Sequence, residues 1–313
     1  MQATSTLKAG SEDTVTAAAP APAAPGNRSW ARAFADLRNG FRQRELWSHL
    51  GWQDIKQRYR RSVLGPLWIT LSMGITALGL GLLYSQLFDS QIGTFLPYIT
   101  TGFIVWHFLL GNLTEGADTF ISNEGLIKHL PAPLSVYVLR TVWRQTIMFG
   151  HNLIVYALMI AVFWGSISRP GYTITQGGIP QPGLDWSALL AIPGFALLAL
   201  NAGWVVLLLG IISTRFRDIP QVISALINLL FFMTPIVWST DILKQRFGDT
   251  VDWRDLIAEL NPLYHFIQIV RAPLIGNEQS WHHWVIVGGI TVVGWALALV
   301  VLRNYRSRVS YWV

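Results

Sequence analysis

Few side chains in this sequence have the types and spacing that catalysis needs. Glu259, His265 and Asp255 are the only clustered candidates for a general base, the group that a membrane-embedded glycosyl- or acyltransferase would require. His282 and His283 form a lone pair at the expected edge of a membrane span, where interfacial placement explains them better than a metal ion does. We therefore predict no catalytic site and no metal site, and we retain a transferase as an alternative.

The sequence also lacks the motifs that would let the chain supply its own energy. It contains no Gly-Lys pair, so the G-x-x-x-x-G-K-[ST] loop that cradles phosphate is absent. Energy for transport must then come from another polypeptide or from an ion gradient. Carboxylates, the usual parts of a proton relay, are missing from the apolar stretches that we expect to span the membrane, which counts against a gradient-driven carrier.

The composition is that of a polytopic membrane protein. Of the 313 residues, 52% are hydrophobic and 13% are charged, against about 25% charged in a typical soluble domain. Apolar runs near membrane length recur along the chain. The net charge of +6 does not imply nucleic acid, because basic residues beside membrane spans produce the same excess. Cysteine is absent, which excludes disulfides and thiolate metal sites.

The chain before the first span divides into two parts. Residues 1–40 begin with an Ala/Pro-rich stretch that has no apolar core, and we expect a disordered extension there. Residues 41–62 mix cations with aromatic and aliphatic residues, so we expect an amphipathic segment on the inner membrane surface. These residues are Lys56, Arg58, Arg60 and Arg61 among Trp47, Trp52, Ile55 and Tyr59. Gly65-Pro66 should form an elbow where the first span begins.

One ideal helix cannot bury all the apolar residues of this surface segment. At 100° per residue they fall on two roughly opposite faces. The two sets are Leu46, Trp47 and Leu50, and Trp52, Ile55 and Tyr59. We expect either a break or a change of contact near Gly51, or the packing of the second face on protein, and a solvated basic helix is the alternative.

The apolar runs predict an all-α fold with six transmembrane helices. The expected spans are residues 63–88, 95–111, 145–164, 188–213, 219–238 and 284–302. The stretch 256–275 is apolar but contains Glu259, Asn261-Pro262, His265 and Arg271, and each charge at mid-bilayer would cost about 2.5–3.5 kcal/mol. We therefore expect it to form two re-entrant half-helices that enter from the periplasmic side before the last span.

The distribution of cations predicts the topology. With six spans and both termini in the cytoplasm, 18 of the 23 Lys and Arg residues lie inside. Counting 256–275 as a seventh span would place Arg303, Arg306 and Arg308 outside. The six-span topology is therefore the better interpretation.

Aromatic residues offer a positive indication of function. The second span contains Phe103, Trp106, His107 and Phe108, and aromatic faces suit a sugar path because they stack on the apolar faces of pyranose rings. We expect these four residues to line a channel, although ordinary helix packing explains each of them equally well.

Several motifs in one order resemble a known family. They are the surface segment, R-Y-R-R-S-V-L-G-P-L-W, R-F-R-D-I-P, N-P-L-Y-H-F-I-Q-I-V-R-A-P-L and the terminal R-S-R-V-S-Y-W-V. Over about residues 45–313 the sequence resembles the permease subunits of ABC-2 type polysaccharide exporters. The resemblance is greatest to the O-antigen and lipopolysaccharide branch, and capsule and teichoic-acid exporters are related families. The resemblance implies that residues 63–313 form an ABC-2 transmembrane domain.

The resemblance implies a transport subunit that is not itself an enzyme. It implies a homodimer in the bacterial inner membrane, joined by two separate ATPase subunits that bind ATP and Mg²⁺, so no cofactor is expected in this chain. The substrate would be a lipid-diphosphate-linked polysaccharide carried from the cytoplasm to the periplasm. A small-molecule exporter of the same superfamily remains an alternative.

Two groups of charged residues acquire expected roles from this resemblance. Arg58, Arg60 and Arg61 stand at the expected entrance, where they would attract the diphosphate, although anchoring to anionic lipid explains them nearly as well. The polar segment 115–130 should include a short cytoplasmic helix that docks on the ATPase, and a solvated loop is the alternative. The expected coupling residues are Glu115, Asp118, Glu124, Arg215 and Arg217.

Overall fold

The computed structural model describes residues 28–65, 67–129, 132–174, 178–239 and 252–313. Regular structure in these ranges is helical, apart from one isolated bridge between Tyr172 and Gln181. The N-terminal elements are α1 (Trp30–Arg42), α2 (Arg44–Arg58), α3 (Leu67–Leu87), α4 (Ile92–Asp118), η1 (Ile121–Asn123), α5 (Glu124–His129) and α6 (Leu134–Ile167). The C-terminal elements are η2 (Trp186–Leu190), α7 (Ala191–Arg215), α8 (Ile219–Met233), α10 (Asp252–Leu260), α11 (Pro262–Ile275) and α12 (Trp281–Trp312).

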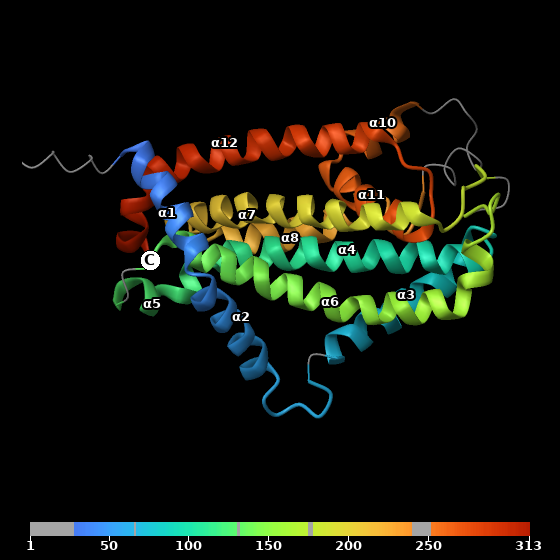
Figure 1. Ribbon diagram of the computed structural model, residues 1–313, viewed down its shortest axis with the longest axis horizontal. Helices are drawn as coiled ribbons and strands as arrows, with labels where there is room; N and C mark the ends of the chain where they lie inside the picture. The colour runs from blue at the N-terminus through green and yellow to red at the C-terminus, as the bar shows by residue number, and fades with distance from the viewer. Residues whose placement is uncertain (1–27, 66, 130–131, 175–177, 240–251) are drawn as a thin grey trace, which may run out of the picture.

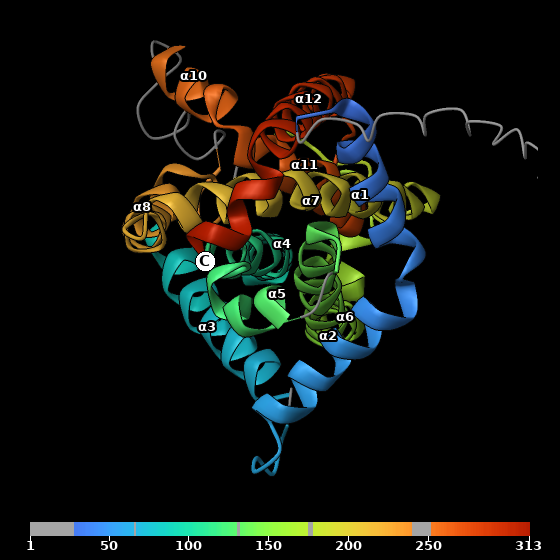
Figure 2. The same cartoon turned by 90° about the vertical axis from the view of Figure 1, so that its left-hand side faces the viewer.

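Helix α4 is the centre of the bundle. It contacts α3, α6, α7, α8 and α11, and Figure 2 shows it in the middle of the end-on view. The buried face of α3 consists of small or flexible residues at helical spacing, among them Ala77 and Gly81, and a Cβ atom at Gly81 would meet Leu96 of α4. Leu71, Ile75 and Leu82 of α3 face outward. The packed core therefore lies around α4, and apolar side chains cover much of the outer surface of α3.

Among the residues that the structure describes, five helical stretches are long and apolar enough to cross a membrane: α3, α4, α6, η2 with α7, and α12. The fifth expected span, 219–238, is helical only over α8, which has 15 residues and is about 22 Å long. Such a length is less than the hydrocarbon thickness of about 30 Å. The helix stops because Thr234 precedes Pro235 and adopts an extended conformation, as a residue before proline prefers. Five of the six expected spans thus coincide with long apolar helices, the helix of the fifth span is shorter than expected, and the count of six transmembrane helices stays a prediction.

The expected break in the stretch 256–275 is confirmed at Asn261-Pro262. Helix α10 ends at Leu260, and the Asn261 side chain accepts a hydrogen bond from Leu263 N at the start of α11. Pro262 occupies the first turn of α11, where its missing N–H costs no hydrogen bond. Insertion of these two helices into a membrane stays a prediction. They lie at the end of the bundle opposite the C-terminus (Figure 1).

The predicted disordered extension 1–40 is wrong for its last part. Residues 30–42 form α1, which begins at an N-cap on Ser29 and packs on α6 and α12. Residues 1–27 lie outside the described part of the chain. The physical reason for the helix is a buried stripe of Ala33, Asp36 and Gly40, in which Gly40 allows Ser135 to approach the α1 backbone.

Asp36 is the main polar contact between α1 and the bundle. Its buried carboxylate accepts hydrogen bonds from the backbone N–H groups of Leu134 (3.2 Å) and Ser135 (3.0 Å), which begin α6. It also accepts one from Arg306 Nε of α12, at 2.7 Å. One carboxylate thus caps a helix N-terminus and pairs a cation from the other end of the sequence.

Helix α2 is continuous through Gly51, so the expected break there is wrong. The chain bends instead at Gln43, between α1 and α2. Packing of the second face on protein is confirmed at Ile55, which is buried, whereas Trp52 of that face is exposed. Trp47 of the first face also packs on α6, where it meets Trp143 edge-on at 5.8 Å. At Gly51 a Cβ atom would stand 3.3 Å from Arg140 O, which shows how closely the two helices approach. Gly65 of the expected elbow has φ of +57°, and Pro66 lies outside the described residues.

We predict that the substitution Asp36→Ala lowers the free energy of unfolding by about 3–5 kcal/mol, because it leaves the cation of Arg306 and two backbone N–H groups without their partner. Thermal or denaturant unfolding of the detergent-solubilised protein measures this loss. Asp118→Ala, at an exposed carboxylate, is the matched control and should change stability little. Equal stability of the two variants would contradict the role given to Asp36.

Candidate functional site

Four charged residues from three helices meet at the end of the bundle that also carries the C-terminus. Arg140 and Arg144 lie one turn apart on α6 and share a face. Arg140 donates two hydrogen bonds to Asp54 of α2. Its Nη2 lies 2.6 Å from Oδ1, and its Nε lies 2.8 Å from Oδ2. Arg144 bridges Asp54 and Glu115 of α4, with a distance of 2.6 Å to each. We call these four residues the ion cluster.

Neighbouring polar side chains complete the ion cluster. Arg58, at the end of α2, contacts Glu115 at 3.1 Å, and Gln145 donates to the same carboxylate at 2.6 Å. Arg140 also donates to Asn123 Oδ1 of η1 at 2.7 Å. An open groove of about 580 Å³ runs over this surface. The surface segment, the central helix, the following turn and α6 are therefore joined by charge-assisted hydrogen bonds.

The environment of Asp54 favours its ionised form. Burial opposes ionisation, but the hydrogen bond and charge of Arg140, together with those of Arg144, outweigh it and hold the pKa of Asp54 below its usual value. Because the pKa is lower in the folded than in the unfolded protein, ionised Asp54 stabilises the fold above its unfolded pKa. That contribution is lost as the pH falls through the folded value, so strong acid weakens the ion cluster.

The structure separates the expected coupling residues into two groups. Glu115 is paired with Arg144 in the ion cluster, whereas Asp118 is exposed at the end of α4. Glu124 lies on the short helix α5, whose existence within 115–130 is confirmed, and Lys128 pairs with it at 2.6 Å. The hydrogen bond and charge of Lys128, with a smaller contribution from Arg217, lower the pKa of Glu124. Both α5 and Arg217 contact α12.

Arg215 and Arg217 both contact the C-terminal end of α12. The guanidinium of Arg215 lies 5.4 Å from the ring centroid of Trp312, and Arg217 Nη2 donates to Trp312 O at 3.4 Å. Of the expected entrance residues, Arg58 joins the ion cluster, and Arg60 and Arg61 are exposed in the turn after α2. The structure thus joins one entrance residue, Arg58, to one coupling residue, Glu115.

Three of the four expected channel-lining residues are packed inside the protomer. Phe103 and Trp106 contact Phe231 of α8, with ring centroids 5.6 Å away in each case. Phe108 packs against Phe149 and Phe195. His107 is half-buried, and its Nδ1 faces Phe103 O at 2.9 Å. Their part in a channel stays a prediction about the assembled transporter.

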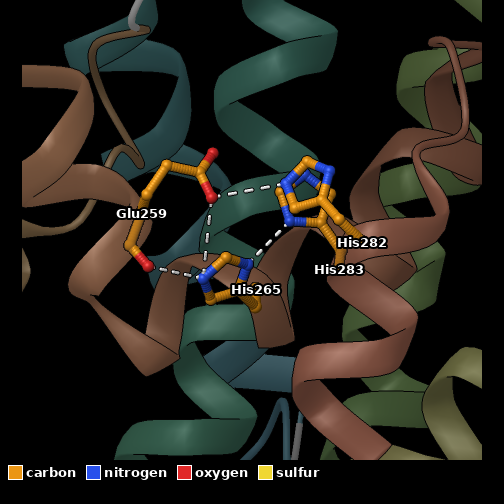
Figure 3. A group of neighbouring side chains, drawn as sticks. All are labelled: Glu259, His265, His282 and His283. Atoms are coloured by element: carbon orange, nitrogen blue, oxygen red, sulfur yellow. Dashed lines mark hydrogen bonds and ion pairs between the residues drawn. The ribbon is translucent and has the colours of Figure 1, made fainter. Parts of the chain in front are cut away.

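Two groups were missed by the sequence interpretation. Arg271 is fully buried, with its guanidinium 4.0 Å from the ring centroid of Tyr98 and Nη1 donating to Pro235 O at 2.8 Å. The expectation of an isolated His282-His283 pair is wrong, because Glu259 and His265 converge on it (Figure 3). The sequence indicated only that His265 and His283 lie on either side of the turn between α11 and α12. The packing of these two helices is what brings the rings together. The side chain of Asp255, the third candidate base, lies outside the described residues.

We predict that a double-mutant cycle will find strong coupling in the ion cluster. Asp54→Asn, Arg140→Gln and the double variant should give an interaction energy of about 1–3 kcal/mol in unfolding experiments, since both side chains are largely shielded from solvent. The matched cycle of Glu124→Gln and Lys128→Gln tests an exposed pair with the same 2.6 Å contact and should give almost no coupling. Similar coupling in the two cycles would contradict a special role for the ion cluster.

Comparison with known proteins agrees with this geometry. Three O-antigen export system permease proteins RfbA, two from Klebsiella pneumoniae and one from Myxococcus xanthus, are similar over 70–82% of the chain. One, from Klebsiella pneumoniae, is 25% identical over 234 residues, which cover 70% of this chain and 82% of the relative. Another, from Myxococcus xanthus, is 24% identical over 237 residues, which cover 75% of this chain and 82% of the relative. Residues 45–275, from the start of α2 to the end of α11, match the ABC-2 type transporter family, and the chain therefore belongs to that family as a multi-pass membrane permease.

Proposed function

We propose that this chain is the membrane-spanning subunit of an ATP-driven exporter that moves a lipid-linked, O-antigen-like polysaccharide from the cytoplasm to the periplasm. The observation that carries the proposal is the similarity to O-antigen export permeases over 70–82% of the chain. The chain has no phosphate-binding loop of its own. Two partner ATPase subunits would therefore bind ATP and Mg²⁺, and the permease would work as a homodimer in the bacterial inner membrane.

Coupling to the ATPase would occur at the end of the bundle that carries the ion cluster. There Asp118 and Glu124 offer carboxylates near α5, and Arg215 and Arg217 offer cations on the neighbouring turn. The ion cluster ties α2 and α4 to α6, so a displacement of α5 would be passed to three helices at once. Glu115 would act inside the permease, where it transmits the displacement to α2 and α6.

Substrate entry would occur at the turn between α2 and α3. Arg60 and Arg61 are exposed there and carry the positive charge that a diphosphate would meet first. Each cation near a membrane surface contributes about 1 kcal/mol toward an anionic headgroup. Arg58 would link this entrance to the central helix through Glu115. Among the four aromatic residues proposed for the path, His107 is the one that is not buried, and it is the first candidate to meet a sugar.

We predict that neutralising the entrance weakens the response to substrate. Arg60→Gln with Arg61→Gln should raise the concentration of lipid-linked polysaccharide that half-maximally stimulates ATPase activity of the reconstituted complex, while basal activity and assembly stay intact. Arg42→Gln with Arg44→Gln, at exposed cations near the bend at Gln43, is the matched control. Arg58→Gln is tested separately because it also removes a partner of Glu115.

An unchanged half-maximal concentration would show that Arg60 and Arg61 only anchor the chain to lipid. A complex that hydrolyses ATP but does not respond to lipid-linked polysaccharide at all would overturn the proposed substrate. That result would favour export of a small molecule by the same family.

We also predict that both termini lie in the cytoplasm. In intact cells a cysteine at Ser310→Cys should resist a membrane-impermeant thiol reagent, whereas Pro180→Cys, at an exposed position at the other end of the bundle, should react. The absence of native cysteine leaves each variant with a single reactive thiol. Labelling of Ser310→Cys from outside would contradict the topology.

A further inference from the structure

Four potential metal ligands from three helices converge at the end of the bundle opposite the C-terminus (Figures 1 and 3). They are Glu259 of α10, His265 of α11, and His282 and His283 of α12. One nitrogen or oxygen from each residue lies within 4.8 Å of the others. Four ligands around a tetrahedral ion, with bonds of about 2.0–2.1 Å, stand about 3.3 Å apart, so small side-chain rotations would bring this set into register.

The hydrogen bonds of His265 orient it as a ligand. Its Nε2 lies 2.8 Å from the backbone oxygen of Glu259, which can only accept, so this nitrogen carries the proton. Its Nδ1 therefore presents a lone pair, and it faces Nδ1 of His283 at 2.7 Å. A ring whose other nitrogen donates to a backbone carbonyl is the usual arrangement of a metal-bound histidine.

The two other members complete the set from the solvent side. Glu259 Oε2 lies 3.3 Å from His282 Nε2, and both side chains are nearly half exposed. His265 and His283 are buried, and Tyr264 packs edge-on against His283 with ring centroids 5.3 Å apart. Two buried ligands are thus combined with two solvent-exposed ligands, which leave a path for an ion to enter.

We propose that Glu259, His265, His282 and His283 bind one divalent metal ion such as Zn²⁺. Three imidazoles and one carboxylate are ligands that suit zinc, and copper and nickel bind similar sets. The ion would replace the single proton shared by Nδ1 of His265 and Nδ1 of His283. The start of α12 contributes a partial positive charge of about half an elementary charge, which the carboxylate of Glu259 more than offsets.

The bound ion would fasten α10 and α11 to α12. Among the described residues, α10 makes its main contacts with α11, and its Glu259 reaches α12 through His282. A metal bridge would fix the angle between the short helix pair and the long last helix. On the topology proposed above, this end of the bundle faces the periplasm, so the bound ion would exchange with that compartment. Metal binding itself does not depend on the identity of the proposed substrate.

The test measures zinc bound to the full-length protein in detergent, purified with an affinity tag that contains no histidine. After equilibration with zinc and removal of free ion, elemental analysis should find about one zinc per chain. The exposed ligands are changed first, because Glu259→Gln and His282→Gln are least able to disturb folding. Each should weaken zinc binding at least about tenfold in calorimetry, and Co²⁺ in place of zinc should give the visible absorption of a tetrahedral site.

His129→Gln is the matched control, since His129 is an exposed histidine at the other end of the bundle. It should leave zinc binding unchanged, and gel filtration should show all three variants as folded as the parent. The protein has no cysteine, so no thiolate can account for bound zinc. Bound zinc well below one per chain, or affinity that Glu259→Gln and His282→Gln leave unaltered, would overturn the proposal and reduce the cluster to a hydrogen-bonded contact.

Discussion

The structure depends on the neutralisation of charge at the end of an apolar bundle. Arg140 and Arg144 lie on α6 just before its most apolar part, and each would be costly there without a partner. Asp54 and Glu115 supply the partners from α2 and α4, at distances of 2.6 Å. Because each arginine makes more than one bond, the surface helix cannot move away from the bundle without exposing several charges together.

A second carboxylate extends the same constraint to the first helix. Asp36 neutralises Arg306 and caps α6, so α1, α6 and α12 meet at one buried group. Asp36 of α1 and Asp54 of α2 thus lie on successive helices, and both carboxylates bind α6. Together they fasten α1 and α2 to one side of the bundle, as Figure 2 shows. A displacement of α2 would reach α4 through the contact of Arg58 with Glu115.

The opposite end of the bundle is organised by polar groups of another kind. Arg271 is buried under Tyr98 and bound to Pro235 O, where α8 has ended early. His265 and His283 meet a few residues away. Backbone that leaves helical geometry next to an apolar core needs such partners, because water is not available to its carbonyl groups. The short helix α8 and the polar contacts beneath it are therefore parts of one arrangement.

The sequence by itself determined what depends on local patterns. Apolar run length predicted the helical, multi-pass class, and Asn261-Pro262 marked the break between α10 and α11. Spacing on one helix also showed that Arg140 and Arg144 share a face. These features follow from backbone geometry within a few residues, and no distant contact is needed to specify them.

Only the tertiary structure decided which partners these residues have. Asp36 meets Arg306 across 270 positions, and Asp54 meets Arg140 across 86. The helix in residues 30–42 was missed because its stability comes from burial of Asp36 and Gly40 against α6, which composition cannot reveal. For the same reason His282 and His283 were interpreted as a lone pair. His265 and Glu259 reach them only because α10, α11 and α12 pack together, and such packing is set by the whole bundle rather than by spacing along the chain.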